Sequence, residues 1–418
     1  MTLAEFHPVV IFALAIGFGM SCAVGANDVA NAMGTSVGSR IITIRQAIVI
    51  AAIFEALGAA SASGQVTMTL RSGIFDVSYF ANAPMQLAYA MLAALMASFS
   101  WLCLATYFRW PVSTTHSIVG ALMGVGALII GMKGIKWSMM RSIFASWIVL
   151  PLFSGGLSYI IFRMTQNLIF LNDSPIKRVK LLMPVYMSVV VFSITYIAIE
   201  ACLPAIGVDY SAIISFGICL GVAFLTFCIG VWLMTYYRVD LSLDYQEQYK
   251  VCEKAFGVLA VITACAMAFS HGSNDVANAI GPLAAIVELV HSGALSESVA
   301  IPWQLTFFGA AGVVIGLGVY GYRIIETVGT QITSLTASRS FAAQFATALM
   351  IVIASGVGLP VSSTQTLVGA VLGVGIARGI GALNLKVIRN IFMSWLVTLP
   401  AGAVLVILFY RFLTWYAL

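Results

Sequence analysis

Long apolar runs separated by short polar or charged connections dominate the pattern of this chain. Runs such as Pro84–Phe108, Leu181–Ala201, Ser211–Tyr236 and Ile391–Phe412 contain few or no charged residues. Each run is near or above the roughly 20 residues that an α-helix needs to cross a bilayer. Twelve spans can be placed in this way, at about residues 8–27, 41–63, 84–108, 112–131, 142–162, 181–201, 211–236, 254–271, 301–320, 341–358, 361–380 and 391–413. The pattern predicts an all-α polytopic membrane protein.

Composition agrees with the span pattern. Of the 418 residues, 61% are hydrophobic and 8% are charged, whereas a soluble domain carries about 25% charged residues. A water-soluble fold could not bury so much apolar surface, so lipid must be the solvent for most of the chain. The formal net charge of +5 is expected from basic residues that gather on the cytoplasmic side, and no nucleic-acid partner is inferred from it. The seven cysteines lie mostly within apolar runs and are interpreted as small buried hydrophobes.

The Lys and Arg residues predict an orientation in the membrane. With the N-terminus outside, 15 of the 20 basic residues face the cytoplasm and 5 face out. The positive-inside rule therefore predicts that both termini lie outside and that the charged stretch Arg238–Lys254 is a cytoplasmic connector. No basic region precedes the first apolar stretch, Val9–Val24, so this stretch is expected to span the membrane and not to be a secretory signal. The expected location is the plasma membrane, which is the inner membrane if the source is a bacterium.

An internal repeat divides the chain. The segment Gly25–Gly34 returns as Gly272–Gly281 with eight of ten positions identical, and Pro111–Ala121 returns as Pro360–Ala370 in the same order. Seven predicted spans separate the starts of the two copies, and this odd number places the halves upside down relative to each other. Inverted-topology repeats are typical of secondary transporters. We therefore expect two inverted repeats, at residues 1–165 and 254–418, joined by a linking region at 166–253.

The repeated Asn-Asp pairs, Asn27-Asp28 and Asn274-Asp275, interrupt apolar segments and are flanked by glycines. An ionisable residue at a helix centre costs about 2.5–3.5 kcal/mol on insertion scales, and each copy bears that cost. The glycines are expected to let the backbone unwind and present carbonyl and amide groups to a ligand. A carboxylate beside amide oxygens suits a small hard cation, so Na⁺ or a proton is expected at Asp28 and Asp275. The alternative is that the two aspartates only join the halves through interhelical hydrogen bonds.

The second repeated motif places three consecutive hydroxyl side chains after Pro-Val, at the start of an apolar helix. Hydroxyls and the free N–H groups of a helix N-terminus form a cradle for an anion without a fixed positive charge. This chemistry suits a tetrahedral oxyanion that must be released again. The alternative is ordinary N-capping by Ser or Thr next to a proline. The candidate anion-binding residues are Ser113, Thr114, Thr115, Ser362, Ser363 and Thr364.

Several single polar residues add to the candidate site. Glu55 lies at the centre of the second predicted span with no basic residue near it in sequence, which favours a role in coupling; the alternative is a partner from elsewhere in the fold. His271 stands where the first copy has Val24 and is interpreted either as a contact or titrating group of the site or as a structural histidine. His116 matches Gln365, which indicates a hydrogen-bonding position and not a metal ligand. Further candidates for the lining of the site are Asn31, Asn278, Gln65, Gln331 and Gln344.

An enzyme is not expected. Gly34-Thr-Ser36-Val-Gly38 fits the hydrolase pattern G-x-S-x-G, but that motif needs a strand, a sharp turn and a catalytic triad. The second copy reads Gly281-Pro-Leu-Ala-Ala and has no serine. The chain also has no Walker A lysine loop and no HExxH motif, and no cofactor is inferred beyond a coupling ion.

The two repeated motifs resemble the duplicated signature of the inorganic phosphate transporter (PiT) family of phosphate permeases. The likeness is carried by Gly25–Gly38, by His271–Pro282 and by the two Pro-Val-Ser segments. It extends over both repeats, at about residues 8–155 and 255–405. The resemblance implies cation-coupled uptake of inorganic phosphate, and dimerisation is an expectation from the family alone.

The resemblance also implies roles for single residues. Asp28 and Asp275 would couple the cation to transport, Ser113 and Ser362 with their neighbours would contact phosphate, and Glu55 would be an acid critical for transport. The sequence departs from the family at one point, because relatives often carry a second glutamate upstream of the later Pro-Val-Ser motif. Gln344 stands at the matching position, so one negative charge of the expected set is missing and the identity or number of the coupling ions is open.

These observations lead to one functional hypothesis and two alternatives. We expect a secondary active transporter that imports inorganic phosphate with Na⁺ or H⁺, or as a metal–phosphate complex, by alternating access. One alternative is a transporter of sulfate or another oxyanion with the same fold. The other is a passive anion channel, which buried Asp28, Glu55 and Asp275 disfavour because they would repel an anion that enters without cations.

Overall fold

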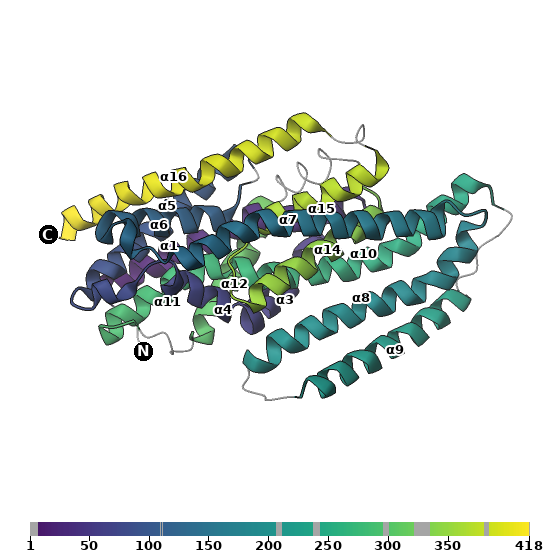
Figure 1. Ribbon diagram of the computed structural model, residues 1–418, viewed down its shortest axis with the longest axis horizontal. Coiled ribbons are helices and arrows are strands. Elements are labelled where there is room, and N and C mark those ends of the chain that lie inside the picture. Colours follow the sequence, from purple (N-terminus) through teal and green to yellow (C-terminus); the bar gives the residue numbers. More distant parts are fainter. Residues whose placement is uncertain are drawn as a thin grey trace.

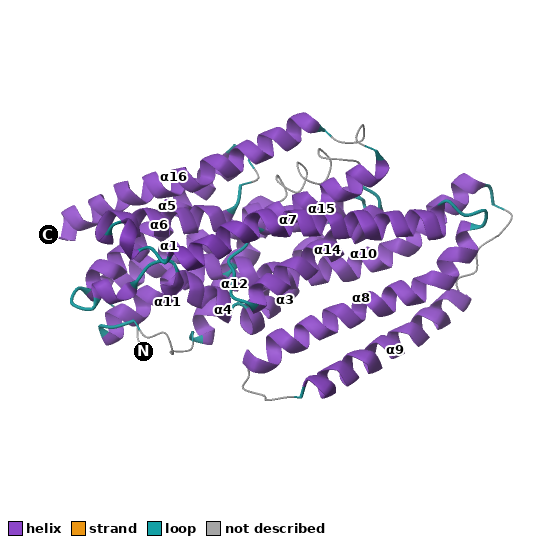
Figure 2. Cartoon of the chain, viewed as in Figure 1, coloured by secondary structure: helices purple, strands orange, loops and turns teal. Residues whose placement is uncertain are grey.

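The chain folds into a bundle of helices. The computed structural model describes residues 7–108, 110, 112–205, 211–236, 243–295, 301–321, 335–379 and 384–417. Within these ranges the backbone is helical apart from short connections and one isolated bridge between Phe75 and Ile135 (Figure 2). The predicted all-α class is confirmed.

The helices follow the predicted spans in order along the chain. The first part contains α1 (Pro8–Val24), α2 (Ala30–Gly38), α3 (Ile44–Ala62), α4 (Gly64–Met68), α5 (Pro84–Tyr107), α6 (Thr114–Ile130) and α7 (Trp137–Thr165). The middle contains α8 (Pro175–Ala205) and α9 (Ala212–Tyr236). The last part contains α10 (Tyr245–Asp275), α11 (Ala277–Ser292), α12 (Trp303–Gly316), α14 (Ala337–Gly356), α15 (Ser363–Arg378) and α16 (Leu385–Ala417). Short π-helical turns extend α4 over Thr69–Gly73, α7 over Gln166–Phe170 and α12 over Leu317–Gly321, and short 3₁₀ turns lie at Val77–Phe80 and Met132–Gly134.

Ten helical segments of the described chain are long and apolar enough to cross a membrane, so this is a multi-pass membrane protein. Two of the twelve predicted spans, 112–131 and 361–380, are shorter than expected. They form α6 and α15, which have 17 and 16 residues, fewer than the roughly 20 that a full crossing needs. The reason is that each helix begins only after an extended N-cap serine, Ser113 or Ser362, and both first turns are buried inside the protein.

The expectation that the helices unwind at the Asn-Asp pairs is wrong. In the first copy a π-helical turn, Gly25–Val29, joins α1 directly to α2. In the second copy α10 continues through Asp275, and α11 begins at Ala277 after one residue. Sequence reasoning also missed α11 as a helix. Together α10 and α11 form a helical segment of 48 residues, which at about 1.5 Å per residue is longer than a typical bilayer is thick.

Small residues let the helices pack closely. α1 packs on α12, α10 on α3 and α14, α7 on α15, and α16 on α5 and α6. α16 runs along the upper edge of the molecule in Figure 1, and α8 and α9 form a separate antiparallel pair at the lower right that rests mainly on α10. Close backbone approach through Gly and Ala is the usual way in which membrane helices associate. The core therefore lies where the repeated motifs are, between the first and last parts of the chain.

Candidate functional site

The glycines of the Asn-Asp motifs serve close packing. A Cβ atom added to Gly25, the first residue of the π-helical turn after α1, would lie 1.9 Å from the carbonyl oxygen of Val313 on α12. A Cβ atom added to Gly272 of α10 would lie 2.2 Å from the carbonyl oxygen of Glu55 on α3. Only glycine permits such a close approach of two backbones. The close contact holds each Asn-Asp pair against a helix from the other part of the chain.

The N-termini of α6 and α15 meet beside these motifs. Ser113 accepts a hydrogen bond from the backbone N–H of His116, and Ser362 accepts one from Gln365, so both serines act as N-caps. The hydroxyl of Thr115 donates to the carbonyl oxygen of Val361 at 2.9 Å, which ties the two N-termini together. For Ser113 and Ser362 the N-capping alternative is thus observed, and the next residues of each motif supply the remaining hydroxyls.

Asp28 receives hydrogen bonds from both N-termini. Thr114 on α6 donates to Oδ2 at 2.5 Å, and Thr364 on α15 donates to Oδ1 at 3.1 Å. The Asp28 side chain is buried. Since Thr364 comes from the second copy of its motif and Asp28 from the first, the interhelical bonding foreseen for the aspartates is present, and it crosses between the two copies.

Asp275 has a different set of partners. The hydroxyl of Ser363 donates to its Oδ2, and Nε2 of His271 lies 2.8 Å from the same oxygen. The other ring nitrogen of His271, Nδ1, lies 3.0 Å from Oε1 of Glu55. The side chains of Glu55, His271 and Asp275 are all fully buried. Glu55 therefore has the hidden partner that the sequence left open, and His271 both contacts the site and holds two carboxylates together.

Asp28, His271 and Asp275 form the centre of the cluster. Each offers a ligand atom, and these atoms lie within 4.8 Å of one another. With Glu55 the cluster has three carboxylates and one imidazole, and no Lys or Arg pairs with these carboxylates in the described part of the chain. Negative charge this deep is unfavourable unless it is neutralised, so the geometry favours a bound cation or proton.

Apart from Oε1 of Glu55, which lies next to His271, four buried amide and carboxylate oxygens in or next to this cluster accept no hydrogen bond from the described residues. They are Oδ1 of Asn27, Oδ1 of Asp275, Oδ1 of Asn278 and Oε2 of Glu55. Their side chains are otherwise fixed: Asn278 donates to Thr114 and Thr115 at 3.1 and 3.2 Å, and Asn27 donates to Thr106 and to the carbonyl of Trp110. Leaving a buried acceptor unsatisfied costs about 1–3 kcal/mol. Oxygens of this kind are the ligands that hard cations such as Na⁺ take, and they fit the ion that the sequence predicted.

Other predicted lining residues lie elsewhere. Gln344 is buried and exchanges hydrogen bonds with Ser36 while accepting one from Thr263, so it belongs to a neighbouring polar contact between α2, α10 and α14. Gln65 is exposed. Gln331 and the side chain of Asn31 lie outside the described residues.

Sequence reasoning missed the residues that hold the two asparagines. Asn274 donates to Ser355 at 3.0 Å and to the carbonyl of Leu359 at 3.1 Å, as Asn27 does to Thr106 and Trp110. The spacing carried a signal, because 355 − 106 = 249 is also the offset between Ser113 and Ser362. Thr106 and Ser355 stand at matching positions of the two copies, and this match of two hydroxyl residues could have identified them as the partners of the asparagines.

Comparison with known proteins agrees with this fold. The sequence model of the family described as "Phosphate transporter family" matches residues 24–406. The chain belongs to this family. It is 47% identical over 399 residues to a Haemophilus influenzae protein named "Putative phosphate permease", with 94% of each chain covered. It is 37% identical over 418 residues to the chloroplastic inorganic phosphate transporter 2-1 of Arabidopsis thaliana, and the match covers 95% of this chain and 70% of that protein.

A solved structure named "The sodium-dependent phosphate transporter" is similar to the whole chain. The TM-score is 0.90 at 36% identity, and the match covers 98% of this chain and 99% of that chain. The family of this chain is thus one of transporters, in agreement with the expectation that it is not an enzyme.

Proposed function

We propose that this member of the phosphate transporter family moves inorganic phosphate across the membrane by symport with a monovalent cation. The observation that carries the proposal is the buried cluster in which Asp28 and Asp275, with unsatisfied oxygens in or beside the cluster, meet the hydroxyl-bearing N-termini of α6 and α15. The sodium dependence named for the similar solved structure is that protein's property; for this chain Na⁺ and H⁺ are both consistent with the donor set.

The hydrogen bonds suggest how the two ligands are coupled. Thr114, Ser363 and Thr364 now donate to the two aspartates. A cation at the carboxylate oxygens would compete with these hydroxyls for the lone pairs and release them to donate to phosphate. The N-termini of α6 and α15 add partial positive charge at the same place. Phosphate without the cation would meet two uncompensated carboxylates, so neither ligand is favoured alone.

The membrane potential makes cotransported cations necessary for accumulation. A phosphate dianion that enters against an inside-negative potential of about 100 mV costs about 4.6 kcal/mol, twice the figure of about 2.3 kcal/mol per charge. Two monovalent cations cancel this cost, and a third lets the potential drive uptake. A metal–phosphate complex that enters with a proton would have the same electrical result.

The proposed mechanism is alternating access between two inverted repeats, residues 1–165 and 254–418, linked by residues 166–253. The contacts that support it cross between the copies: Thr364 bonds Asp28, Asn278 bonds Thr114, and Gly272 packs on Glu55. A site shared in this way opens when one half rocks against the other. The positive-inside rule places both termini outside, in the plasma membrane or the bacterial inner membrane.

Uptake of radiolabelled phosphate into proteoliposomes tests the proposal, with a Na⁺ gradient and a pH gradient imposed separately. Accumulation above equilibrium under one gradient, and none without it, is the expected result. Uptake that follows only the gradient of the anion would show a passive channel and overturn symport. Unlabelled sulfate is the second arm, and inhibition equal to that by unlabelled phosphate would reassign the substrate to a broader oxyanion class.

A further inference from the structure

A polar contact lies between the transport cluster and one end of the helix bundle. Gln344 on α14 exchanges hydrogen bonds with Ser36 on α2, at 2.8 and 3.1 Å, and accepts one from Thr263 on α10 at 3.2 Å. These three side chains are fully buried and form the inner contact. Thr263 and Gln344 precede Asn274 and Ser355 of the site by 11 residues (274 − 263 and 355 − 344), which is about 16 Å along a helix.

In the proposed topology the inner contact lies on the cytoplasmic side of the site. α10 and α14 run toward the site from beginnings that carry Lys254 and Arg339. By the positive-inside rule, helix ends with such residues lie in the cytoplasm. The inner contact therefore separates the transport cluster from the cytoplasm.

The opposite side of the site is closed by the repeated counterpart of this contact. At the repeat offsets of 247 and 249, the residues that match Thr263, Ser36 and Gln344 are Ile16, Leu283 and Leu95. They belong to α1, α11 and α5, which pack on one another as α10, α2 and α14 do. Leu95 and Leu283 are fully buried, and a Cβ atom added to Gly17 of α1 would lie 3.0 Å from Leu283. This outer contact is apolar at every position where the inner contact is polar.

A further polar group extends the inner contact toward the cytoplasm. Ser340 lies one turn before Gln344 on the same face of α14. It is fully buried, and its Oγ makes no hydrogen bond with the described residues. Its counterpart at the offset of 249 is Met91, which is also fully buried. A buried hydroxyl without a partner indicates an ordered water or a ligand that binds in another state of the protein.

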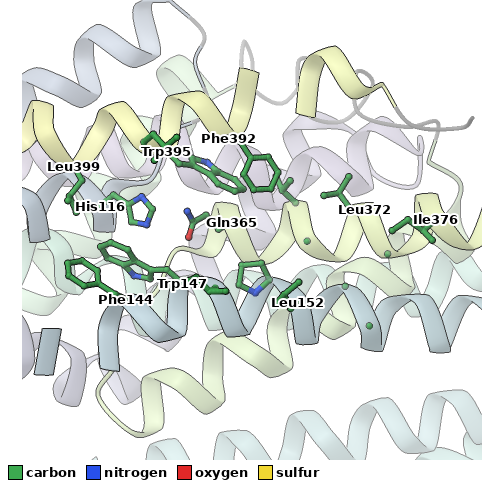
Figure 3. Close-up of a pocket in the computed structure, with 18 of the residues that line it drawn as sticks. His116, Phe144, Trp147, Leu152, Gln365, Leu372, Ile376, Phe392, Trp395 and Leu399 are labelled. Carbon is green, nitrogen blue, oxygen red and sulfur yellow. The ribbon is translucent and has the colours of Figure 1, made fainter. Parts of the chain in front are cut away.

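The large cavity between α7 and α16 does not offer phosphate another route. It has a volume of about 1060 Å³, and Figure 3 shows the aromatic side chains of Phe144, Trp147, Phe392 and Trp395 around it. Leu152 at its wall is 69% exposed on a helix that is long and apolar enough to cross the membrane, so the cavity faces lipid. A phosphate ion would lose its hydration there without gaining a partner.

The two contacts differ in what they expose when they open. Groups that hydrogen-bond to each other can exchange their partners for water with a small net change in free energy. Leucine and isoleucine side chains have no such exchange, and wetting them costs the full hydrophobic transfer. The inner contact is thus the easier one to hydrate.

We propose that the inner contact is a gate, which opens by exchanging its hydrogen bonds for water and for the departing phosphate and cation, and that the outer contact is an apolar seal. The inference rests on the proposed phosphate transport and adds the route by which the ligands leave. Hydroxyl and amide groups carry no charge, so the gate can contact both ions without retaining either.

The triple variant Ser36→Ala, Thr263→Val and Gln344→Met tests the gate. It removes the three polar groups together, so none of them loses its partner, and such a replacement is close to neutral for stability. Uptake of radiolabelled phosphate into proteoliposomes should be about tenfold slower, because opening now wets apolar side chains. Equilibrium binding of phosphate to the variant in detergent should stay unchanged.

Thr347→Val is the matched control. Thr347 is a buried hydroxyl residue on the same helix and donates to the carbonyl of Ala343 within α14. This variant should take up phosphate at the wild-type rate.

Hydrogen–deuterium exchange of the unaltered protein in lipid nanodiscs tests the inference without a variant or a substrate. Backbone amides of residues 341–352 on α14 should exchange about tenfold faster than those of the matching residues 92–103 on α5, because hydration of the gate opens α14 locally. Both helices are mostly buried, so the comparison is between like environments. The difference should disappear in the triple variant and remain in Thr347→Val.

A triple variant that takes up phosphate at the wild-type rate would overturn the gate. Equal exchange of the two segments in the unaltered protein would overturn it as well, and this measurement decides if the triple variant does not fold. Failure of the proposed function has a different signature, since the unaltered protein would then accumulate no phosphate under either gradient. The exchange comparison still decides in that case whether the inner contact opens more readily than the outer one.

Discussion

The two copies of the Asn-Asp motif have the same packing and different chemistry. In the first copy Gly25 lies against Val313, and in the second Gly272 lies against Glu55. The reverse contacts also match, since Gly316 of α12 lies against Cys22 and Gly58 of α3 lies against Phe269. The four contacts relate α1 to α10 and α12 to α3 residue by residue. These two helix pairs therefore pack in the same way.

The titratable groups are not duplicated with this packing. By these contacts Val313 is the counterpart of Glu55, as Val24 is of His271. The two polar residues form a pair in the second copy, with Nδ1 of His271 at 3.0 Å from Oε1 of Glu55. Both members are apolar in the first copy. The difference indicates that the acid at position 55 is useful only together with the imidazole, since without His271 it would be a buried carboxylate without a partner.

The shared packing predicts equal and large effects of Gly25→Ala and Gly272→Ala. Each new methyl group would overlap a backbone carbonyl, which cannot move as a side chain can. Overpacking of this kind costs typically about 1–3 kcal/mol and more when backbone must shift. We expect neither variant to yield folded protein, measured by size-exclusion profile and melting temperature in detergent.

Gly221→Ala on α9 is the matched control, because no atom lies within 4 Å of its added Cβ. It should melt at or slightly above the wild-type temperature, since alanine is the better helix former. Wild-type melting of Gly25→Ala or Gly272→Ala would show that the close contact at that copy is not required, and the shared packing would lose its support.

The shared aspartates predict equal loss of function. Asp28→Asn and Asp275→Asn keep the shape of the side chain and one acceptor oxygen, and at Asp28 the amide NH₂ would donate to the second neighbouring hydroxyl, but each removes one charge from the proposed cation site. Uptake of phosphate should fall to the level of empty vesicles while the amount of folded protein stays unchanged. Asp76→Asn is the control, since Asp76 caps Ser78 at the surface, and it should transport normally. Normal uptake by both site variants would remove the aspartates from the mechanism.

The sequence predicts the parts of this site that repeat, because a repeated motif can be detected in one dimension. The spans, the paired Asn-Asp residues and the paired hydroxyls all appear as matched segments at offsets near 248. Glu55 and His271 could not be joined in this way. They are 216 residues apart (271 − 55), on α3 and α10, and no periodicity of the chain relates them.

Glycine was detected in the sequence but its role was misread. Glycines beside a polar motif were expected to unwind the helix, yet Gly25 and Gly272 sit in helical backbone and admit a neighbouring carbonyl. Conformational freedom and small size are both properties of glycine, and a sequence does not show which one is used. Which property is used depends on the position of the neighbouring helix, and that position is set by the tertiary structure.

The unequal pair predicts strong coupling between Glu55 and His271. His271→Val alone leaves the buried Glu55 without its counter-charge, which costs about 3–5 kcal/mol, whereas Glu55→Val leaves His271 with Asp275 as its remaining partner. The double variant copies the apolar pair of the first half, Val24 and Val313. Its melting temperature should therefore be higher than the sum of the two single losses predicts.

Asp275 loses its contact with His271 in the two variants that lack the imidazole, but it keeps the hydrogen bond from Ser363 in all three. Circular dichroism should show equal helix content in the variants that fold. Strictly additive losses would mean that the acid and the imidazole act independently, and the pairing inferred from the two copies would be wrong.

The smallest difference between the copies lies at the two asparagines. Asn274 makes three hydrogen bonds, because its Oδ1 also accepts from the backbone N–H of Val361 at 3.1 Å. Asn27 makes two, and its Oδ1 has no partner among the described residues. Asn274→Ala should therefore destabilise the protein by about 1 kcal/mol more than Asn27→Ala, the net worth of one hydrogen bond.

Cation dependence should show the opposite order at these two positions. The free Oδ1 of Asn27 is available to a cation, whereas that of Asn274 is already used by the backbone. Asn27→Ala should raise the cation concentration needed for half-maximal phosphate uptake more than Asn274→Ala does, in spite of its smaller effect on melting temperature. If both measurements rank the variants in the same order, the asparagines act only as structural ties, and the coupling ion is held by the carboxylates alone.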